Sequence, residues 1–330
     1  MINAAVIGLG WWGSTLVRTL QGSDSIRIST GVDPNEAGML AGRDLGLRMA
    51  GSFEEVVADP SIDAVLLCTP HKFHAAQVVA AAKSGKHVFC EKPFTDNVRA
   101  AEEALDAVSR AGVVLGIGHE RRFEPAVMQM RDLVSSGKLG DAVSFEGNFS
   151  QDKFLALPRD NWRLSAEHAP VGPLSATGIH LVDMAISLLG HPDQVWANLS
   201  SDFAGFDNGD SLSISLKFSK GRTATINAIL VTPFVGRAAV YGTEGWFEIR
   251  DRTHPEASTG WDLALSLRGQ DTQVDFSPPY SAVRANVEAF AMAATGDAEY
   301  PVTHAEIRSN VATFEAILAS VRSGAIERVG

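Results

Sequence analysis

Three glycines near the start of the chain have the types and spacing to bind a phosphate. Gly8, Gly10 and Gly13 follow a short apolar segment in the pattern Gly-x-Gly-x-x-Gly. In this pattern the first glycine makes a tight turn, the second lets the backbone approach a pyrophosphate, and the third lets the next helix pack closely. A helix expected over residues 11–21 would direct its free N–H groups toward the phosphates. The segment predicts a dinucleotide-binding turn, with a glycine turn of some other α/β protein as the alternative.

An acidic residue, Asp33, lies twenty residues beyond Gly13, at the end of a second apolar segment. A carboxylate at this place accepts hydrogen bonds from the ribose 2′-hydroxyl and repels a 2′-phosphate, which favours NAD. Asn35 and Arg43 follow, and because an arginine can accommodate a 2′-phosphate, NADP stays open.

A lysine, Lys92, directly follows a predicted strand over residues 87–90, between Glu91 and Pro93. Ligands of open parallel sheets bind at the carboxyl ends of the strands, so Lys92 is a candidate active-site ammonium. The alternative is a solvated lysine in a turn.

The preceding strand, residues 64–68, ends at the same predicted edge. Thr69, Pro70 and His71 follow it, and we expect these residues or His74 to line the nicotinamide side of a cofactor. For His71 a histidine in a surface loop is an equal alternative.

A histidine, His180, stands in the first turn of a helix predicted over residues 178–189. The apolar stripe of this helix predicts that His180 points away from the core, with Asp183 about one turn later. A neutral imidazole can accept a hydroxyl proton, which makes His180 a candidate base. The alternative is a structural histidine that caps the helix or pairs with Asp183, and Asp183 is interpreted as its partner or as a cap.

The elements that would position these residues alternate between strands and helices up to about residue 119. This alternation predicts βαβ units and a doubly wound parallel sheet in an α/β protein. The predicted strands are residues 4–7, 26–32, 64–68, 87–90 and 113–117. We therefore expect a Rossmann domain over residues 1–119.

The second part, residues 120–330, has a different pattern, because apolar and polar residues alternate along half-exposed strands. The predicted strands are residues 143–150, 212–218, 224–230 and 263–267, and the predicted closing helices are residues 282–294 and 305–321. We expect an α/β domain with a large open, mostly antiparallel sheet. Its uncovered face favours a homo-oligomer, a dimer or a tetramer.

Composition narrows the class of partner. The chain has 330 residues, 45% of them hydrophobic, which suffices for two globular domains. A net charge of −11 disfavours nucleic acid and anionic membranes, so a small molecule is the expected partner. The two cysteines predict reduced core thiols and neither a disulfide nor a metal site. Without a signal sequence or a long apolar run, the expected location is cytoplasmic.

Taken together, these motifs resemble the Gfo/Idh/MocA family, which includes glucose-fructose oxidoreductase and inositol dehydrogenase. The resemblance covers nearly the whole chain and rests on Gly8 to Gly13, Cys68 to His74, Gly85 to Pro93, Arg122 to Pro125 and Gly178 to Asp183. It implies a Rossmann domain that holds NAD or NADP, a C-terminal sheet used in oligomer contacts, and reversible oxidation of a sugar or polyol carbinol.

The resemblance also implies roles for individual residues. Lys92 and His180 would be catalytic, and Trp162, Arg163 and Asp183 would contact the substrate. The expected cofactor-binding residues are Gly8, Gly10, Trp11, Trp12, Gly13, Asp33, Thr69, Pro70, His71, His74, Glu91 and Lys92.

One position departs from the family pattern. Many members have an aspartate four residues before the histidine, where this chain has Ala176. A residue four positions earlier lies about one helical turn away on the same side. Either Lys92 and His180 suffice, or Asp183, Glu167 or His168 supplies the missing contact, or turnover is lost.

The resulting hypothesis is hydride transfer between nicotinamide and a carbinol or ketone carbon of a sugar, polyol or glycoside. His180 would take the hydroxyl proton and Lys92 would stabilise the developing alkoxide. Two alternatives remain: a non-catalytic protein that binds cofactor or sugar at a decayed site, and a redox-neutral glycoside-processing enzyme that holds NAD tightly.

Overall fold

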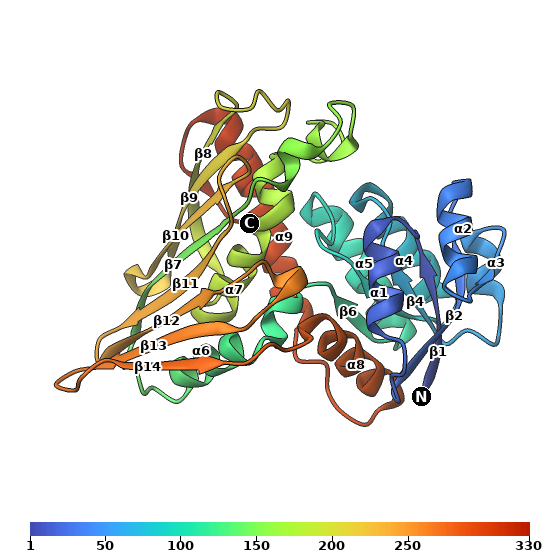
Figure 1. The fold of residues 1–330 in the computed structure, drawn as a ribbon, viewed down its shortest axis with the longest axis horizontal. Coiled ribbons are helices and arrows are strands. Elements are labelled where there is room, and N and C mark those ends of the chain that lie inside the picture. Colours follow the sequence, from blue (N-terminus) through green and yellow to red (C-terminus); the bar gives the residue numbers. More distant parts are fainter. The chain divides into compact units, whose positions relative to one another are not determined.

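The computed structural model describes residues 1–330, which form two compact units (Figure 1). The first unit contains residues Met1–Glu120 and Ser281–Val311. The second contains residues Arg121–Tyr280 and Ala312–Gly330. The chain therefore leaves the first unit after residue 120, returns to it for residues 281–311, and ends in the second unit.

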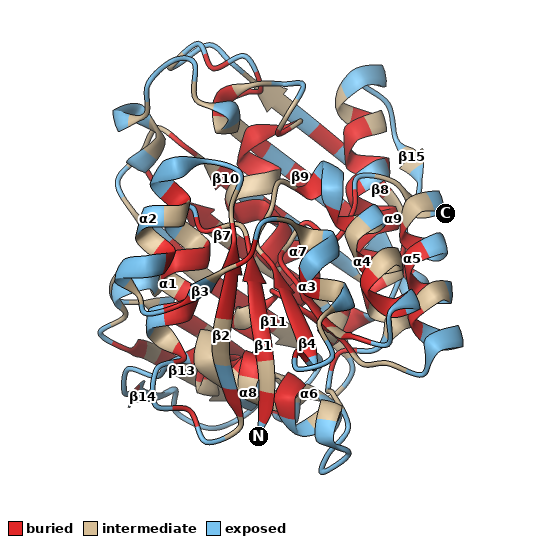
Figure 2. Ribbon diagram, turned by 90° about the vertical axis from the view of Figure 1, so that its right-hand side faces the viewer, coloured by how far each residue is buried: buried red, intermediate tan, exposed pale blue.

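The first unit is built on a parallel sheet of six strands in the order β3-β2-β1-β4-β5-β6. The strands are β1 (Ile2–Ile7), β2 (Ile26–Val32), β3 (Arg48–Met49), β4 (Ala64–Leu67), β5 (His87–Cys90) and β6 (Leu115–Ile117). Strands β1 and β4 are apolar and almost wholly buried, as strands covered on both faces must be (Figure 2). The predicted doubly wound Rossmann sheet is confirmed.

Helices connect the strands of this sheet. They are α1 (Trp11–Thr19), α2 (Glu36–Asp44), α3 (Phe53–Ala58), α4 (His74–Lys83) and α5 (Val98–Ala111). Helix α8 (Ala282–Thr295) belongs to the same unit, because Val287 and Phe290 pack into one cluster with Leu66 and Phe89. Phe89 and Phe290 meet edge to face, with ring centroids 5.7 Å apart.

The second unit is built on a mixed sheet of nine strands in the order β14-β13-β12-β11-β7-β10-β9-β8-β15. The strands are β7 (Ala142–Ser150), β8 (Pro192–Ser200), β9 (Ser211–Phe218), β10 (Thr223–Ile229), β11 (Val235–Gly242), β12 (Gly245–Asp251), β13 (Trp261–Leu267), β14 (Gln273–Ser277) and β15 (Glu327–Arg328). Only β7 and β10 pair in parallel. The expected large, mostly antiparallel sheet is confirmed.

Helices cover one face of this sheet. They are α6 (Pro125–Ser135), α7 (Ile179–Leu189) and the later part of α9 (His304–Ser323), and their apolar side chains share a core with the strands (Figure 1). Alternation along β9 directs its apolar residues to this core and its polar residues outward.

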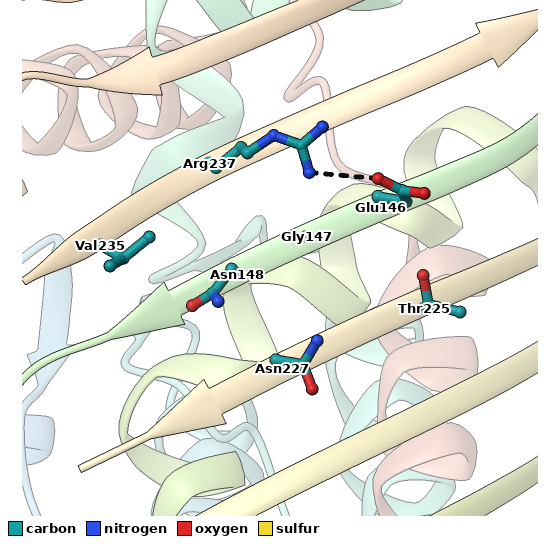
Figure 3. A pocket seen from close by; sticks show the side chains of 7 residues that line it. All are labelled: Glu146, Gly147, Asn148, Thr225, Asn227, Val235 and Arg237. Atoms are coloured by element: carbon teal, nitrogen blue, oxygen red, sulfur yellow. Dashed lines mark hydrogen bonds and ion pairs between the residues drawn. The ribbon is translucent and has the colours of Figure 1, made fainter. Parts of the chain in front are cut away.

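The opposite face of the sheet carries polar side chains and a shallow hollow on β7, β10 and β11 (Figure 3). Arg237 spans this surface and binds Glu146 at 3.1 Å and Glu248 at 2.8 Å. Thr225 and Asn227 line the hollow from β10. The part of the outer face around this hollow is therefore mostly polar.

Two aspects of the expected organisation need correction. Residues 281–311 were expected in the second domain, but they group with the first unit, because the apolar side of α8 completes the core of the parallel sheet. Strands β8, β11, β12, β14 and β15 and helix α6 were not predicted from the pattern. None of the helices combines the length and apolarity needed to cross a membrane.

Candidate active site

The glycine turn between β1 and α1 has the geometry that its sequence predicts. Gly8 has a φ of +92°, and a Cβ there would lie 2.9 Å from the carbonyl oxygen of Cys68. A Cβ on Gly13 would lie 1.9 Å from the carbonyl oxygen of Gly8. A Cβ on Gly10 would meet nothing within 4 Å, so the glycine leaves open space at the start of α1. This turn fits a pyrophosphate, because the free N–H groups of the first helical turn border that space.

The carboxylate of Asp33, directly after β2, makes structural hydrogen bonds that the sequence did not predict. Asp33 accepts hydrogen bonds from the backbone N–H of Leu9 at 2.7 Å and of Asn35 at 2.8 Å. A Cβ on Gly38 would lie 2.2 Å from the Asp33 side chain, so this glycine makes room for the carboxylate. Asp33 thus holds the glycine turn, and each oxygen keeps a lone pair for a ribose hydroxyl.

The two tryptophans at the start of α1 lie against each other. Their ring centroids are 5.5 Å apart, and Trp11 is 56% exposed. An exposed aromatic ring beside the glycine turn is available to contact a bound molecule.

The segment after β4 is tied to the segment after β5 through a buried histidine. His74 is 1% exposed, with Nε2 at 2.8 Å from the carbonyl oxygen of Thr69 and Nδ1 at 2.9 Å from that of Pro93. Burial lowers its pKa to about 4, so the ring is neutral and one of the two nitrogens donates. His71 is also buried. His74 was expected to line the nicotinamide side, but the structure gives it a bracing role.

A buried carboxyl group precedes the candidate ammonium. Glu91 is 7% exposed, and its Oε2 lies 3.3 Å from the backbone nitrogen of Lys92. Burial and the nearby charge of Glu120 raise the pKa of Glu91 to about 7. Gly118 leaves the space for this carboxyl group, since a Cβ there would lie 2.5 Å from it. Glu91 therefore packs beneath the segment that carries Lys92.

The candidate base lies on a helix that is buried on almost every side. His180 is 5% exposed, and residues 179–186 of α7 are all buried. His180 is therefore buried as well as the residues of the predicted apolar stripe, and the expectation that it points away from the core is wrong. The ring of His180 lies 5.9 Å from that of Phe149, centroid to centroid.

Asp183 has a partner that the sequence did not predict. Its two carboxylate oxygens accept hydrogen bonds from Nε and Nη2 of Arg122 at 2.6 and 2.7 Å. Both side chains are 3% exposed or less. Because Arg122 engages both oxygens, Asp183 serves as a buried ion-pair partner of Arg122 and orients α7.

The segment before α7 is a π-helix, residues Leu174–Gly178. It follows Val171, whose φ of +51° is unusual for a β-branched residue. A π-helix has i to i+5 hydrogen bonds, so one turn spans more residues than in an α-helix. Both Ser175 and Ala176 therefore lie about one turn before His180. Ala176 packs against a small apolar cluster of Leu164, Phe206 and Leu230. The methyl group of Ala176 thus contributes to the packing of this apolar cluster.

Two residues implied in substrate contact form a stacked pair. The guanidinium carbon of Arg163 lies 4.5 Å from the ring centroid of Trp162, and burial lowers the pKa of Arg163. Asn208 holds this turn by donating from Nδ2 to the carbonyl oxygens of Arg163 and Ala169.

The chain matches known proteins along most of its length. Residues 2–119 match a family described as an oxidoreductase family with an NAD-binding Rossmann fold, and residues 127–248 match the Gfo/Idh/MocA C-terminal domain. Over 317 residues it is 32% identical to D-xylose 1-dehydrogenase (NADP(+)) 2 of Haloferax volcanii, covering 92% of this chain and 95% of that protein. The chain belongs to the Gfo/Idh/MocA family of oxidoreductases.

Other known proteins are also similar to this chain. A 2,7-anhydro-N-acetylneuraminate hydratase of Escherichia coli is 32% identical over 233 residues, 68% of this chain and 62% of that protein. The crystal structure of an aldose-aldose oxidoreductase from Caulobacter crescentus has a TM-score of 0.86 at 24% identity and covers 99% of each chain. That likeness shows a shared fold.

The sequence analysis named Arg122 as part of a family motif but gave it no role. Arg121 and Arg122 follow β6 within a dense run of ionisable residues, 119–124, which was the available signal. A charged run directly after a buried strand is often solvated, but here Arg121, Arg122 and Glu124 are each 3% exposed or less.

Proposed function

We propose that the chain oxidises a carbinol carbon of a sugar, polyol or glycoside with NAD, and reduces the corresponding ketone in the reverse direction. The observation that carries the proposal is the glycine turn with open space at Gly10. This turn belongs to a chain that is 32% identical, over 92% of the chain's length, to a protein named D-xylose 1-dehydrogenase (NADP(+)) 2.

Lys92 and His180 are the proposed catalytic residues. His180 accepts the hydroxyl proton of the substrate, and Lys92 stabilises the negative charge that develops on the same oxygen. Bound nicotinamide supplies the hydride acceptor. Support comes from the fold, since Lys92 follows the carboxyl end of β5 and His180 is fixed on a helix that Asp183 and Arg122 anchor.

Several residues are proposed to bind the two ligands. Arg163 offers a guanidinium stacked on Trp162 to a substrate oxygen. Thr69, Pro70 and His71 follow β4 at the same sheet edge as Lys92 and line the nicotinamide. Trp11 packs against the cofactor beside the glycine turn.

NAD is the preferred cofactor under this proposal. Asp33 presents a carboxylate at the end of β2, which accepts from ribose hydroxyls and repels a 2′-phosphate. Fluorescence titration with NADH and NADPH tests the preference. NADPH that binds about tenfold more tightly than NADH would reverse it.

The experiment that tests the function is a change in nicotinamide absorbance. Purified protein is incubated with NAD or NADP and a panel of aldoses, polyols and anhydrosugars, and with NADH and their keto forms. Turnover of at least one sugar supports the proposal. Cofactor binding without any absorbance change across the panel contradicts it.

A redox-neutral reaction is the second candidate, because one similar protein is named a hydratase. Such an enzyme holds its nicotinamide through the catalytic cycle. Cofactor that stays bound through purification, together with a sugar product formed without net NADH, would favour it.

We further propose a homo-oligomer, a dimer or a tetramer, that uses the outer face of the nine-stranded sheet. The support is the width of this face, which no helix of the unit covers (Figure 1). We also propose a cytoplasmic location, which is supported by the free thiols of Cys68 and Cys90. Cys68 follows β4, and Cys90 is the last residue of the neighbouring strand β5. Light scattering of the purified protein tests the oligomeric state. The net charge of −11 argues against a nucleic-acid partner.

A further inference from the structure

The edge strand of the parallel sheet, β6, ends beside the segment that carries Lys92. Its last residue, Ile117, lies opposite Cys90 of β5, and the backbone nitrogen of Gly118 donates to the carbonyl oxygen of Cys90 at 2.9 Å. No strand pairs with the other side of β6. The N–H and carbonyl groups of Ile117 on that side therefore need partners from elsewhere in the fold.

Two side chains of the returning segment, residues 281–311, bind both groups. The backbone nitrogen of Ile117 donates to the hydroxyl oxygen of Tyr300 at 3.1 Å, and this hydroxyl donates to Oδ1 of Asn286 at 2.6 Å. Nδ2 of Asn286 then donates to the carbonyl oxygen of Ile117 at 2.9 Å. We call these three residues the Ile117 ring. Each member donates once and accepts once, so the ring takes the place of a seventh strand.

The surroundings of the Ile117 ring are closely packed. Asn286 is 1% exposed and lies one turn before Phe290 on α8. A Cβ on Gly116 of β6 would lie 2.9 Å from the ring of Phe290 and 2.7 Å from that of Phe89, so α8 lies directly against the strand (Figure 1). Loss of one bond of the ring would leave a buried donor or acceptor without a partner, which a strand end in contact with water would not experience.

The residue after the Ile117 ring bears on the proposed active site. Gly118 lies against the carboxyl group of Glu91, because a Cβ there would lie 2.5 Å from it. Oε2 of Glu91 accepts from the backbone nitrogen of Lys92 at 3.3 Å. The charged groups that act on this carboxyl group are Glu120 and Lys92. A shift of the end of β6 would therefore change the packing of Glu91 and its contact with Lys92.

The Lys92 segment is held from two sides. On one side, His74 binds the carbonyl oxygen of Pro93 through Nδ1 at 2.9 Å. On the other side, the support is the Glu91 carboxyl group with the end of β6 behind it. The second support has no strand beyond it and depends on side chains that lie far away in the sequence.

We infer that Tyr300 and Asn286 are positioning residues for Lys92. They close the edge of β6, hold Gly118 against the Glu91 carboxyl group, and through Glu91 fix the backbone of Lys92. The inference rests on the proposed function, because Lys92 is the proposed catalytic ammonium. It also gives a role to the return of residues 281–311 to the first unit, since this segment supplies the groups that another strand would supply.

Two variants of nearly unchanged shape open the Ile117 ring. Tyr300→Phe removes the hydroxyl group, and Asn286→Asp removes the donor to the Ile117 carbonyl oxygen. Arg284→Met is the matched control, because Arg284 also lies on α8 and donates to two backbone carbonyl oxygens after α1, at 3.2 and 2.9 Å. This control loosens the helix at another contact and leaves the Ile117 ring in place.

Two kinds of measurement are needed, of which one does not depend on turnover. Steady-state kinetics, with D-xylose first and then the other sugars of the panel, give kcat and KM, and fluorescence titration gives the NADH affinity. Infrared titration follows the C=O band of the protonated Glu91 carboxyl group, which is identified by comparison with Glu91→Gln. The pKa obtained in this way reports how strongly the carboxyl group is shielded from water.

Both ring variants should lower kcat about tenfold, because a displaced ammonium stabilises the transition state less well. KM and the NADH affinity should change less than about twofold, since the binding contacts remain. The pKa of Glu91 should fall from about 7 toward its ordinary value of 4.5, because water reaches the loosened carboxyl group. Arg284→Met should lower the melting temperature and leave kcat and the Glu91 pKa unchanged.

The other outcomes separate this inference from the proposed function. In a protein that turns over a sugar, ring variants that change only kcat, only the Glu91 pKa, or neither would overturn the inference. Equal losses in Arg284→Met, or loss of folding in both ring variants, would show a general structural role and overturn it too. If no sugar is turned over, the proposed function is contradicted, and the infrared titration decides. A Glu91 pKa that falls only in the ring variants would then still support the hold on the Lys92 segment, and an unchanged pKa would overturn it.

Discussion

Asp183 binds Arg122 through both carboxylate oxygens, at 2.6 and 2.7 Å, one turn after His180 on the same helix. Both partners are buried, so this ion pair fixes the rotation of α7 and with it the position of the proposed base. A bidentate pair defines direction as well as distance.

Removal of one member of this pair should be strongly destabilising. Arg122→Met leaves the Asp183 carboxylate buried without its partner, and Asp183→Leu does the same to Arg122. Each should lower the free energy of unfolding by about 3–5 kcal/mol. Urea denaturation of both variants and of the double variant measures the coupling. Additive losses in the double variant would show that the pair contributes no coupling energy.

The two glycines of the turn should respond differently to alanine. A Cβ at position 10 meets no protein atom, so Gly10→Ala should leave the melting temperature unchanged and weaken NADH binding about tenfold or more. A Cβ at position 13 would lie 1.9 Å from the carbonyl oxygen of Gly8, so Gly13→Ala should cost about 1–3 kcal/mol of stability or more. Calorimetry and fluorescence titration measure the two effects. Unchanged NADH affinity in Gly10→Ala would argue against a pyrophosphate at this turn.

Lys92→Ala should lower kcat by on the order of 10²–10³-fold and leave NADH affinity nearly unchanged, because the ammonium acts on charge that develops in the transition state. Lys83→Ala is the control, since Lys83 is an exposed lysine at the end of α4. Near-normal turnover in Lys92→Ala would remove this residue from the chemistry.

Glu91 should make stability depend on pH. Its folded-state pKa of about 7 lies above the ordinary value of 4.5, because burial and then the charge of Glu120 disfavour the carboxylate. The protonated group thus contributes stability that is fully present below about pH 4.5 and is lost as pH rises through about 7. The total is on the order of 3 kcal/mol.

Glu91→Gln removes this titration and keeps the shape of the side chain. Relative to the variant, the unaltered protein should lose stability between about pH 5 and pH 8, measured by urea denaturation at each pH. Parallel pH profiles of the two proteins would show that Glu91 does not titrate in this range.

Ala176→Asp tests whether the site has decayed. Because Ala176 packs against Leu164, Phe206 and Leu230, a carboxylate there would be partly desolvated and should cost about 1–3 kcal/mol without raising turnover. A variant that folds normally and gains activity would instead support loss of an ancestral aspartate.

The sequence determined the local features of this protein. A short apolar run produced the buried parallel strand β4, and the alternation of residues 211–218 produced a half-exposed strand. The spacing of the glycines and the position of Asp33 after β2 predicted the nucleotide-binding turn. The backbone conformation of such a turn depends on residues that are neighbours along the chain, so a sequence pattern can reveal it.

Only the tertiary structure decided how distant residues are used. Periodicity predicted a helix over α7 but not that almost all its sides would be buried, since that depends on elements packed around it. The sequence pattern did not reveal that Asp183 pairs with Arg122, which is sixty-one residues away. Burial and ion pairing depend on which surfaces meet in space, and a linear pattern carries no record of that choice.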